Sequence, residues 1–225
     1  MDALGDRMKS QYENRTRYYL PRRTYTIVRV DGKAFHTLTR GMEKPFDNHF
    51  ANCMTGTCEY LFDEMGGSQL AYVQSDEISV LLTDFKEIDT QAWFDGNLQK
   101  ICSVSASIAT AYFNHKISGM DRIVPFAHFD SRVFTISDRN EVSNYFVWRT
   151  RDAIRNSINM LGQAHFSRND LDGKNTTEVQ DMLMTKGINW NDIHPRHKTG
   201  CLLNRQGKID IPKTELYNFY LGLIP

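Results

Sequence analysis

Two short acidic motifs carry the chemistry that this sequence suggests. Val30-Asp31-Gly32-Lys33-Ala34-Phe35-His36 and Gln74-Ser75-Asp76-Glu77-Ile78 each lie at the end of an apolar, β-like run. A carboxylate at the end of one strand can meet a second carboxylate in a tight hairpin over one edge of a sheet. Two carboxylates placed in this way can hold Mg²⁺ ions on a nucleoside triphosphate, which is the arrangement that phosphoryl and nucleotidyl transfer use.

The elements that must position these motifs follow the order β-α-β-β-α-β, which is the ferredoxin-like pattern. β-branched runs predict the strands, Asp47 can cap the first helix of this core, and Gly66-Gly67 can end it. The second helix is rich in small residues, which favours close packing on a sheet. The predicted elements are, in order, a strand over residues 25–30, a helix over 48–65, strands over 70–74 and 78–82, a helix over 91–113 and a strand within 127–136.

This topology explains why the two motifs matter together. In a split βαβ unit the third strand lies between the first two and runs antiparallel to both, so the end of strand one lies beside the start of strand three. Asp31 and Asp76 fall at that shared edge. The alternative interpretation is that Asp31-Gly32 is a plain turn and Asp76 a plain hairpin residue. Either motif alone favours that alternative, whereas both in this topology favour a metal site.

The remaining sequence predicts helices at both ends of this core and a final hairpin. Residues 5–19 are typical of a charged amphipathic helix that Pro21 ends. We therefore expect an α+β fold with its core and N-terminal helix in residues 1–136 and a helical and β-hairpin extension in 137–225 that packs on the core as one unit. The extension's predicted elements are a long helix over 138–163, a short one over 177–186, and strands over 201–204 and 208–211.

One polar stripe on the long helix has two interpretations. Arg149, Asp152, Asn156 and Asn159 recur at helical spacing and share one face. The first interpretation is a solvated face, and the second is a face that points at a substrate.

Composition narrows the class of protein. The chain has 225 residues, of which 40% are apolar and 24% charged, and its formal net charge is zero. The zero charge argues against an indiscriminate nucleic-acid binder but allows a local basic face. The four cysteines form no Cys-x-x-Cys pair, so we expect reduced structural thiols. The polar start and the lack of a long apolar run fit a cytoplasmic enzyme without membrane spans.

Further motifs, together with the two acidic ones, resemble a known family. They are Lys44-Pro45-Phe46-Asp47, the small-residue run 103–111, Phe129-Asp130-Ser131-Arg132 and Trp148-Arg149-Thr150-Arg151-Asp152. In this order they resemble the tRNA-His guanylyltransferases and their Thg1-like relatives, the polymerases that add nucleotides in the 3′-to-5′ direction. The resemblance covers nearly the whole chain. It implies a palm-like catalytic core with two Mg²⁺ ions, ATP and a further nucleoside triphosphate as substrates, and assembly as a homotetramer.

The resemblance also implies roles for individual residues. Asp31 and Asp76 would be the catalytic carboxylates that bridge both metals, with the Gly32 carbonyl as an added ligand. A Gly-containing turn offers backbone N–H groups to an anion, so a triphosphate would lie against residues Gly32, Lys33, Ala34, Phe35 and His36. Lys44 and Asp47 would lie near the first nucleotide, and Ser75 and Lys100 near the triphosphate of a second one. Glu77 follows the family pattern with an accessory or structural role.

The family's reaction needs no protein nucleophile, and the sequence contains neither a nucleophile elbow nor a P-loop. ATP adenylylates the 5′-phosphate of a tRNA, and the 3′-hydroxyl of the incoming nucleotide then expels AMP. Family members that add one untemplated guanosine to tRNA-His carry His-Ile-Asn-Asn where this chain has Ile154-Arg155-Asn156-Ser157. This difference favours template-dependent repair of truncated 5′ ends, with single guanosine addition as the alternative.

Contacts to tRNA are expected mainly at phosphates. The candidates are Arg132, Arg149, Arg151, Arg155, Asn156 and Lys198. Two competing functions remain at this point. A nucleotide cyclase shares the metal chemistry, but the chain lacks a double glycine directly before its acidic pair. A non-catalytic ferredoxin-like RNA-binding module would need a run of exposed aromatic residues on its central strands, and we find none.

Overall fold

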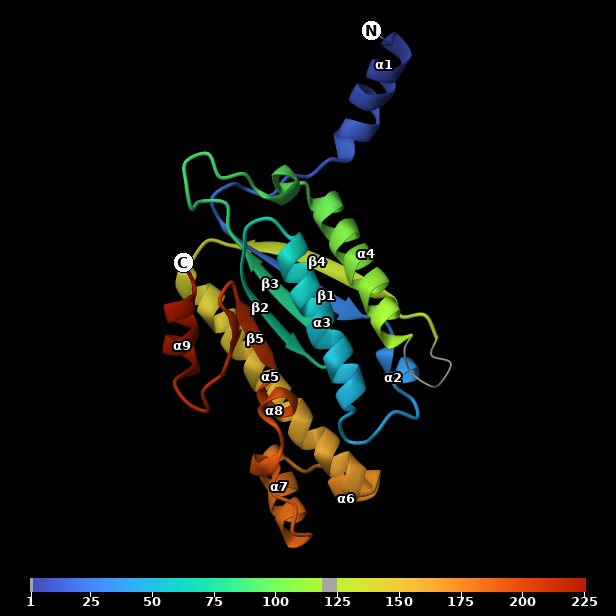
Figure 1. The fold of residues 1–225 in the computed structure, drawn as a ribbon, viewed down its shortest axis with the longest axis vertical. Coiled ribbons are helices and arrows are strands. Elements are labelled where there is room, and N and C mark those ends of the chain that lie inside the picture. The colour runs from blue at the N-terminus through green and yellow to red at the C-terminus, as the bar shows by residue number, and fades with distance from the viewer. Residues whose placement is uncertain (1, 119–124) are drawn as a thin grey trace.

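An antiparallel sheet organises the protein and places its acidic motifs. In the computed structural model, residues 2–118 and 125–225 are described, and within them a six-stranded sheet has the order β4-β1-β3-β2-β5-β6 (Figure 1). β3 lies between β1 and β2 and is antiparallel to both, which confirms the predicted ferredoxin-like core. The strands are β1 (Tyr25–Gly32), β2 (Ser68–Gln74), β3 (Glu77–Leu82), β4 (Phe129–Ile136), β5 (Cys201–Asn204) and β6 (Gly207–Ile209).

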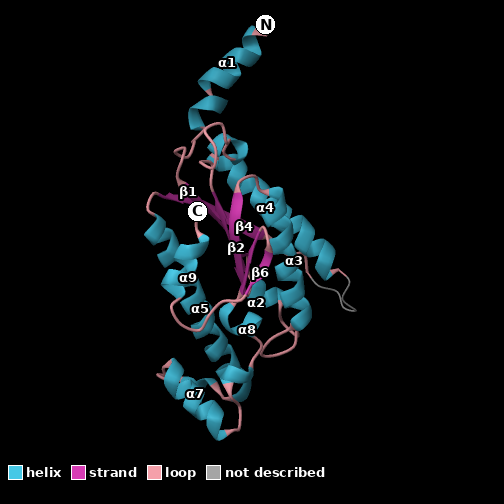
Figure 2. Ribbon diagram, turned by 60° about the vertical axis from the view of Figure 1, so that its left-hand side comes forward, coloured by secondary structure: helices cyan, strands magenta, loops and turns pink. Residues whose placement is uncertain are grey.

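Helices cover both faces of the sheet. α3 (Asn48–Glu64) and α4 (Leu98–Ile117) lie on one face, and α5 (Arg139–His165) and α9 (Leu216–Leu223) lie on the other (Figures 1 and 2). Successive residues of β1 point to opposite faces, so Val28 and Val30 enter the core beneath α3, whereas Ile27 packs beneath α5. By the same alternation, Arg29 and Asp31 point to the α5 face. This alternation decides on which side of the sheet the site forms.

Capping residues set where the helices begin. Asp47 accepts a hydrogen bond from the Phe50 amide at 2.8 Å, and Asp138 caps α5 in the same way. The prediction that a helix begins near residue 91 is wrong, because Phe94 and Asp95 have positive φ in a short 3₁₀ turn, η2 (Trp93–Gly96). Asn97 then caps α4 by accepting from the amide of Lys100 at 3.0 Å.

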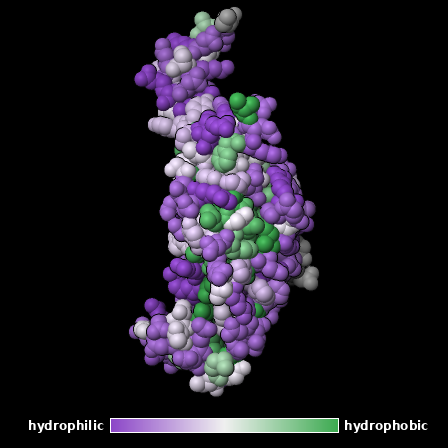
Figure 3. All heavy atoms as spheres, turned by 90° about the vertical axis from the view of Figure 1, so that its left-hand side faces the viewer, coloured by the Kyte–Doolittle hydropathy of each residue, from purple (hydrophilic) through white to green (hydrophobic). Residues whose placement is uncertain are grey.

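The N-terminal segment is less helical than predicted. Instead of one helix over residues 5–19, it forms α1 (Ala3–Gln11) and a 3₁₀ turn, η1 (Glu13–Thr16), neither of which buries a residue. α1 projects from the body of the molecule, and its surface is largely hydrophilic (Figures 1 and 3). After η1 the chain is extended, because Tyr18 and Leu20 make backbone hydrogen bonds with Leu98 and Gly96.

The C-terminal part joins the core in three ways. β5 pairs with β2, so the predicted hairpin extends the sheet itself. α6 (Arg168–Leu171) and α7 (Thr176–Thr185) pack on the far end of α5, and α8 (Pro195–Thr199) precedes β5. The short helices α2 (Phe35–Leu38), α6, α8 and α9 (Leu216–Leu223) were not predicted from the sequence. α9 accounts for the apolar C-terminal end, since Tyr220 on this helix and Ile224 directly after it are buried against α5.

Two expectations from composition can be compared with the structure. The four cysteines are all free thiols in the structure, as expected. None of the helices within the described residues is both long and apolar enough to cross a membrane.

Candidate active site

The register of the sheet brings the two acidic motifs together. Asp31 is paired with Glu77 across β1 and β3, and the Gly32 amide donates to the Asp76 carbonyl at 3.0 Å. Asp31 lies within β1, and Asp76 follows Ser75, whose φ of 49° belongs to a tight turn. The two aspartates therefore meet at one end of the sheet, as the topology predicted.

The electrostatics of this pair suit a cation. Burial raises the pKa of Asp76 above its ordinary value, and the neighbouring charge of Asp31 adds to that rise. Within residues 2–118 and 125–225 no group of three or more His, Cys, Asp or Glu side chains is arranged to hold a metal. Mg²⁺ does not need such a cage, because it keeps water molecules and binds through one or two carboxylates and substrate phosphates. The donor set therefore fits a metal that arrives with a nucleotide.

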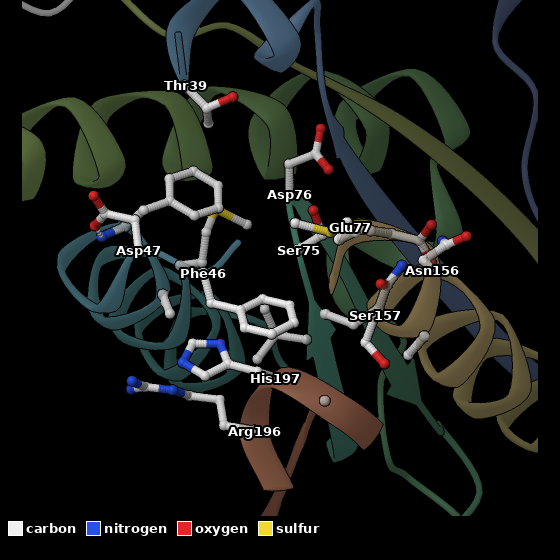
Figure 4. A pocket seen from close by; sticks show the side chains of 18 of the residues that line it. Thr39, Phe46, Asp47, Ser75, Asp76, Glu77, Asn156, Ser157, Arg196 and His197 are labelled. Atoms are coloured by element: carbon white, nitrogen blue, oxygen red, sulfur yellow. Dashed lines mark hydrogen bonds between the residues drawn. The ribbon is translucent and has the colours of Figure 1, made fainter. Parts of the chain in front are cut away.

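A cavity of about 540 Å³ opens beside the carboxylates. Figure 4 shows side chains converging on it from the turn between β2 and β3, from the segment before α3, from α5 and from α8. Of the predicted site residues, those that line it are Asp31, Lys44, Asp47, Ser75, Asp76, Glu77, Arg149 and Asn156. All four residues of the polar stripe on α5 line this cavity, so the stripe is not simply a solvated outer face.

The end of the cavity away from the two aspartates, called the far end below, is lined by aromatic and basic side chains. Phe46 stacks on His197 with ring centroids 4.8 Å apart, and Arg196 donates to the side chains of Asn52 at 2.5 Å and Asn48 at 2.9 Å. Burial, with the Arg196 charge beside it, lowers the pKa of His197 to about 4. The sequence does not predict this stack, because nothing in it links Phe46 with a residue so distant along the chain.

The turn after Asp31, the predicted triphosphate cradle, makes hydrogen bonds within the fold. The Gly32 amide bonds to Asp76, and the Lys33 amide donates to the His128 carbonyl at 2.8 Å. In this structure both amides already donate to carbonyls of the fold, so the contact of a triphosphate with residues 32–36 stays a prediction. Gly32 is required for packing, since a Cβ there would lie 2.4 Å from the Phe35 ring, which is itself buried. Ala34 and His36 stay exposed at the start of α2.

Lys100 lies away from the two carboxylates. It belongs to the first turn of α4, where its ammonium lies 5.8 Å from the centre of the Phe94 ring. Gly32 is paired with Phe129 across β1 and β4, and the Phe129 amide donates to the Thr110 hydroxyl at 3.2 Å. Thr110 therefore marks the part of α4 that lies near Gly32. Ten residues of helix span ~15 Å. Lys100 therefore does not line this cavity, and its contact with the triphosphate of a second nucleotide stays a prediction.

Asp47 is near the cavity but serves the fold as well. Burial opposes its ionisation, yet hydrogen bonds from the amides of Phe50, Glu43 and His49 outweigh burial and lower the pKa of its carboxyl group. The charged side chain thus caps α3 while one part of it lines the cavity.

Glu77 anchors a buried network of ion pairs. Its carboxylate accepts from Arg149 Nε at 2.7 Å and Nη2 at 2.8 Å, and from Arg29 Nη2 at 2.5 Å. Glu77 and Arg149 are both nearly inaccessible, with side chains 5% and 4% exposed. Arg149 also pairs with Asp152 at 3.0 Å. The network joins β1, β3 and α5 directly behind the aspartate pair.

Comparison with known proteins decides the family. A family model described as tRNAHis guanylyltransferase (Thg1) matches residues 5–137. The chain belongs to the Thg1 family. This confirms the resemblance, and the protein is accordingly a nucleotidyltransferase.

Individual relatives of this Thg1-family protein agree in sequence and fold. A bacterial Thg1-like protein solved in complex with ATP is 48% identical, with a TM-score of 0.85 over 90% of this chain and 86% of that chain. A bacterial Thg1-like structure in complex with GTP is 45% identical, with a TM-score of 0.79 over 90% of this chain and 84% of that one. The tRNA(His) guanylyltransferase of Eremothecium gossypii is 27% identical over 83% of this chain and 84% of its own length.

The predicted tRNA contacts of the Thg1-family protein separate into buried and exposed residues. Arg149 is bound inside the ion network, and Lys198 is 7% exposed and donates to the Asn191 carbonyl at 2.6 Å. Both side chains are almost wholly buried and paired inside the protein, with only Arg149 bordering the cavity, so the structure does not support the prediction that they contact tRNA on the outer surface. The candidates that remain on the surface are Arg132, Arg151 and Arg155, with Asn156 on the cavity wall.

Proposed function

We propose that this Thg1-family protein is a template-dependent 3′–5′ nucleotidyltransferase that adds nucleotides to the 5′ end of tRNA through a 5′-adenylylated intermediate. The observation that carries the proposal is the Asp31–Asp76 pair at the rim of a cavity of about 540 Å³. Cavities of this size bind nucleotide-sized ligands. The ATP and GTP complexes of bacterial relatives that are 48% and 45% identical support nucleoside triphosphates as substrates.

Two Mg²⁺ ions would be held by Asp31, Asp76 and the Gly32 carbonyl. When bound, they would neutralise charge on the phosphoryl oxygens and orient attacking and leaving groups. Both attacking groups belong to substrates: first the tRNA 5′-phosphate on ATP, then the 3′-hydroxyl of the incoming nucleotide. The protein's task is to hold these groups in line, a positioning role that suits Lys44, Ser75 and Asn156 on the cavity wall.

Template dependence is supported by the segment 154–157 on α5. This stretch reads Ile154-Arg155-Asn156-Ser157 and lacks the histidine expected of enzymes that add an untemplated guanosine. Ser157, which stands where that motif has its last asparagine, lines the cavity, whereas Ile154, which stands in place of the histidine, packs against the hydrophobic cluster between α5 and α7. If Watson–Crick pairing selects the nucleotide, the protein need not recognise the base.

The proposal includes assembly from several copies, as a homotetramer. α1 buries no residue within its own chain, and it exposes Leu4 and Met8 together with the nearby Tyr12. A second copy could cover these side chains and help to bind tRNA. Because the proposed substrate is a processed or damaged tRNA, we place the reaction in the cytoplasm.

The test uses a 5′-monophosphorylated tRNA that lacks its first nucleotide, with Mg²⁺, ATP and each nucleoside triphosphate in turn. The wild type should add only the nucleotide complementary to the base opposite, and Asp76→Ala should add none. Addition of guanosine whatever the opposing base would instead support a tRNA-His guanylyltransferase. A cyclic product from GTP alone, or no addition under any condition, would overturn the proposal.

A further inference from the structure

One guanidinium lies between the metal-binding end of β1 and the buried ion network. Arg29 Nη2 is 2.5 Å from Glu77 Oε2 and 3.5 Å from Asp31 Oδ2. Only the contact with Glu77 has the geometry of a hydrogen bond. Arg29 is thus placed between two carboxylates and is hydrogen-bonded to the more buried one, Glu77.

α5 fixes the position of Glu77. Arg149 grips the carboxylate with both Nε and Nη2, and each of these donors is buried. Such bidentate pairing fixes orientation as well as distance. Glu77 therefore offers Arg29 a buried carboxylate in a fixed orientation, with a side chain only 5% exposed. The side chain of Asp31 is 28% exposed and has no such bidentate partner among the described residues.

Arg29 has donor capacity that the described structure leaves unused. Its Nε is buried and has no hydrogen-bond partner among the described residues. Arg29 and Asp31 are two residues apart on β1 and point to the same face of the sheet. Glu77 is paired with Asp31 across β1 and β3, so its side chain points to that face as well. If Glu77 lost its charge, Asp31 would be the neighbouring carboxylate already within reach of this guanidinium.

Arg132 Nη2 also lies 3.9 Å from Asp31 Oδ2, but its side chain is 59% exposed and can move into solvent. We propose that Glu77 is a positioning residue that holds Arg29 at 3.5 Å from Asp31, too far for a hydrogen bond, and thereby leaves the Asp31 carboxylate oxygens available to a divalent cation. The inference rests on the metal site of the proposed function. An arginine paired closely with Asp31 would compete with the cation for the same oxygens and would weaken the attraction by its own charge. Arg149 acts one step further away by holding Glu77.

The test measures Mn²⁺ binding directly, by the electron paramagnetic resonance signal of the free ion, so it does not depend on activity. Glu77→Gln keeps the shape and removes the charge, and it should weaken Mn²⁺ binding by ~10-fold, a change of ~1.4 kcal/mol. The double variant Glu77→Gln/Arg29→Met removes the competitor as well, and its affinity should return to within ~3-fold of the wild type. Glu59→Gln, which removes an exposed carboxylate paired with Lys208 at 2.9 Å, is the matched control and should change nothing.

Two outcomes would overturn the inference. One is wild-type affinity in Glu77→Gln, and the other is a double variant as weak as Glu77→Gln, since Glu77 would then act by some route other than Arg29. Thermal unfolding checks that each variant is folded. If Glu77→Gln does not fold, Arg29→Met alone decides: affinity equal to or tighter than wild type supports the inference, and weaker affinity refutes it. Asp31→Asn tests the underlying site separately, because unchanged Mn²⁺ binding there would refute the metal site itself.

Discussion

The two ends of the cavity carry opposite charge: one end is acidic, and the other is basic and aromatic. At one end Asp31 and Asp76 stand close together, and their like charges raise the pKa of Asp76 on top of the effect of burial. At the other end Arg196 is met by the neutral amides of Asn48 and Asn52, and His197 stays neutral beside it. The acidic end is left with negative charge to attract a cation, whereas the far end offers one positive charge, hydrogen bonds and a stacked ring pair. A nucleoside triphosphate matches such a division, with its metal-bound phosphates at one end.

Removing a carboxylate from the acidic end should erase this contrast and have the largest effect. Asp76→Asn should lower the single-turnover rate of nucleotide addition by ~10³-fold, because the phosphoryl charge would lose much of its stabilisation. The unfolding free energy should hold or rise, since the like-charge contact with Asp31 is relieved. Asp63→Asn on α3, where the side chain is 75% exposed, is the matched control. Comparable rates in the two variants would contradict our assignment of the acidic end.

Stability should distinguish Arg149 from Arg196, which line opposite ends of the cavity. Arg149→Met leaves Glu77 buried with Arg29 as its remaining partner, and we expect a loss of ~3 kcal/mol or more. Arg196→Met leaves only neutral amides unpaired and should cost ~1 kcal/mol. Urea denaturation of both variants measures the difference. Equal losses of unfolding free energy would show that breaking the ion network costs no more than breaking the amide contacts.

The stacked pair at the far end should matter for binding. Phe46→Ala removes one ring of the stack with His197, and if a nucleotide occupies this end the KM for its triphosphate should rise ~10-fold. The rate at saturation should change little, because Phe46 lies away from the carboxylates. Steady-state kinetics would contradict this view if the rate at saturation fell while KM stayed constant.

The smallest expected effect is a pH dependence of stability. The pKa of His197 is lowered to about 4, so the folded protein keeps this ring neutral while the unfolded chain binds a proton at the ordinary value of 6.5. The unfolded state therefore binds more protons between these values, and stability is lost as pH falls from 6.5 towards 4. His197→Gln should remove ~1 kcal/mol of that loss, once partial exposure is allowed for. If the unfolding free energies of wild type and His197→Gln changed with pH by the same amount between 6.5 and 4, this assignment to His197 would be wrong.

Local sequence patterns are enough to specify the order of the core elements and the meeting of the two aspartates. Alternating β-branched runs specify the strands around Asp31 and Asp76, and Asp47 and Asp138 mark where helices begin. Each of these signals depends on neighbours within a few residues. The split βαβ topology then leaves one place for both motifs, so the acidic end follows from the order of the residues along the chain.

Which charged side chains are free depends instead on tertiary contacts. Arg149 and Lys198 look like surface cations in the sequence, but Arg149 meets Glu77, 72 residues away in the chain, and Lys198 is covered. Lys100 was assigned to the site by family pattern, yet its turn of α4 lies far along the helix from Gly32. Phe46 and His197 likewise meet only after folding. A local pattern cannot encode these outcomes, because burial and partnership depend on residues that folding brings together from distant parts of the chain.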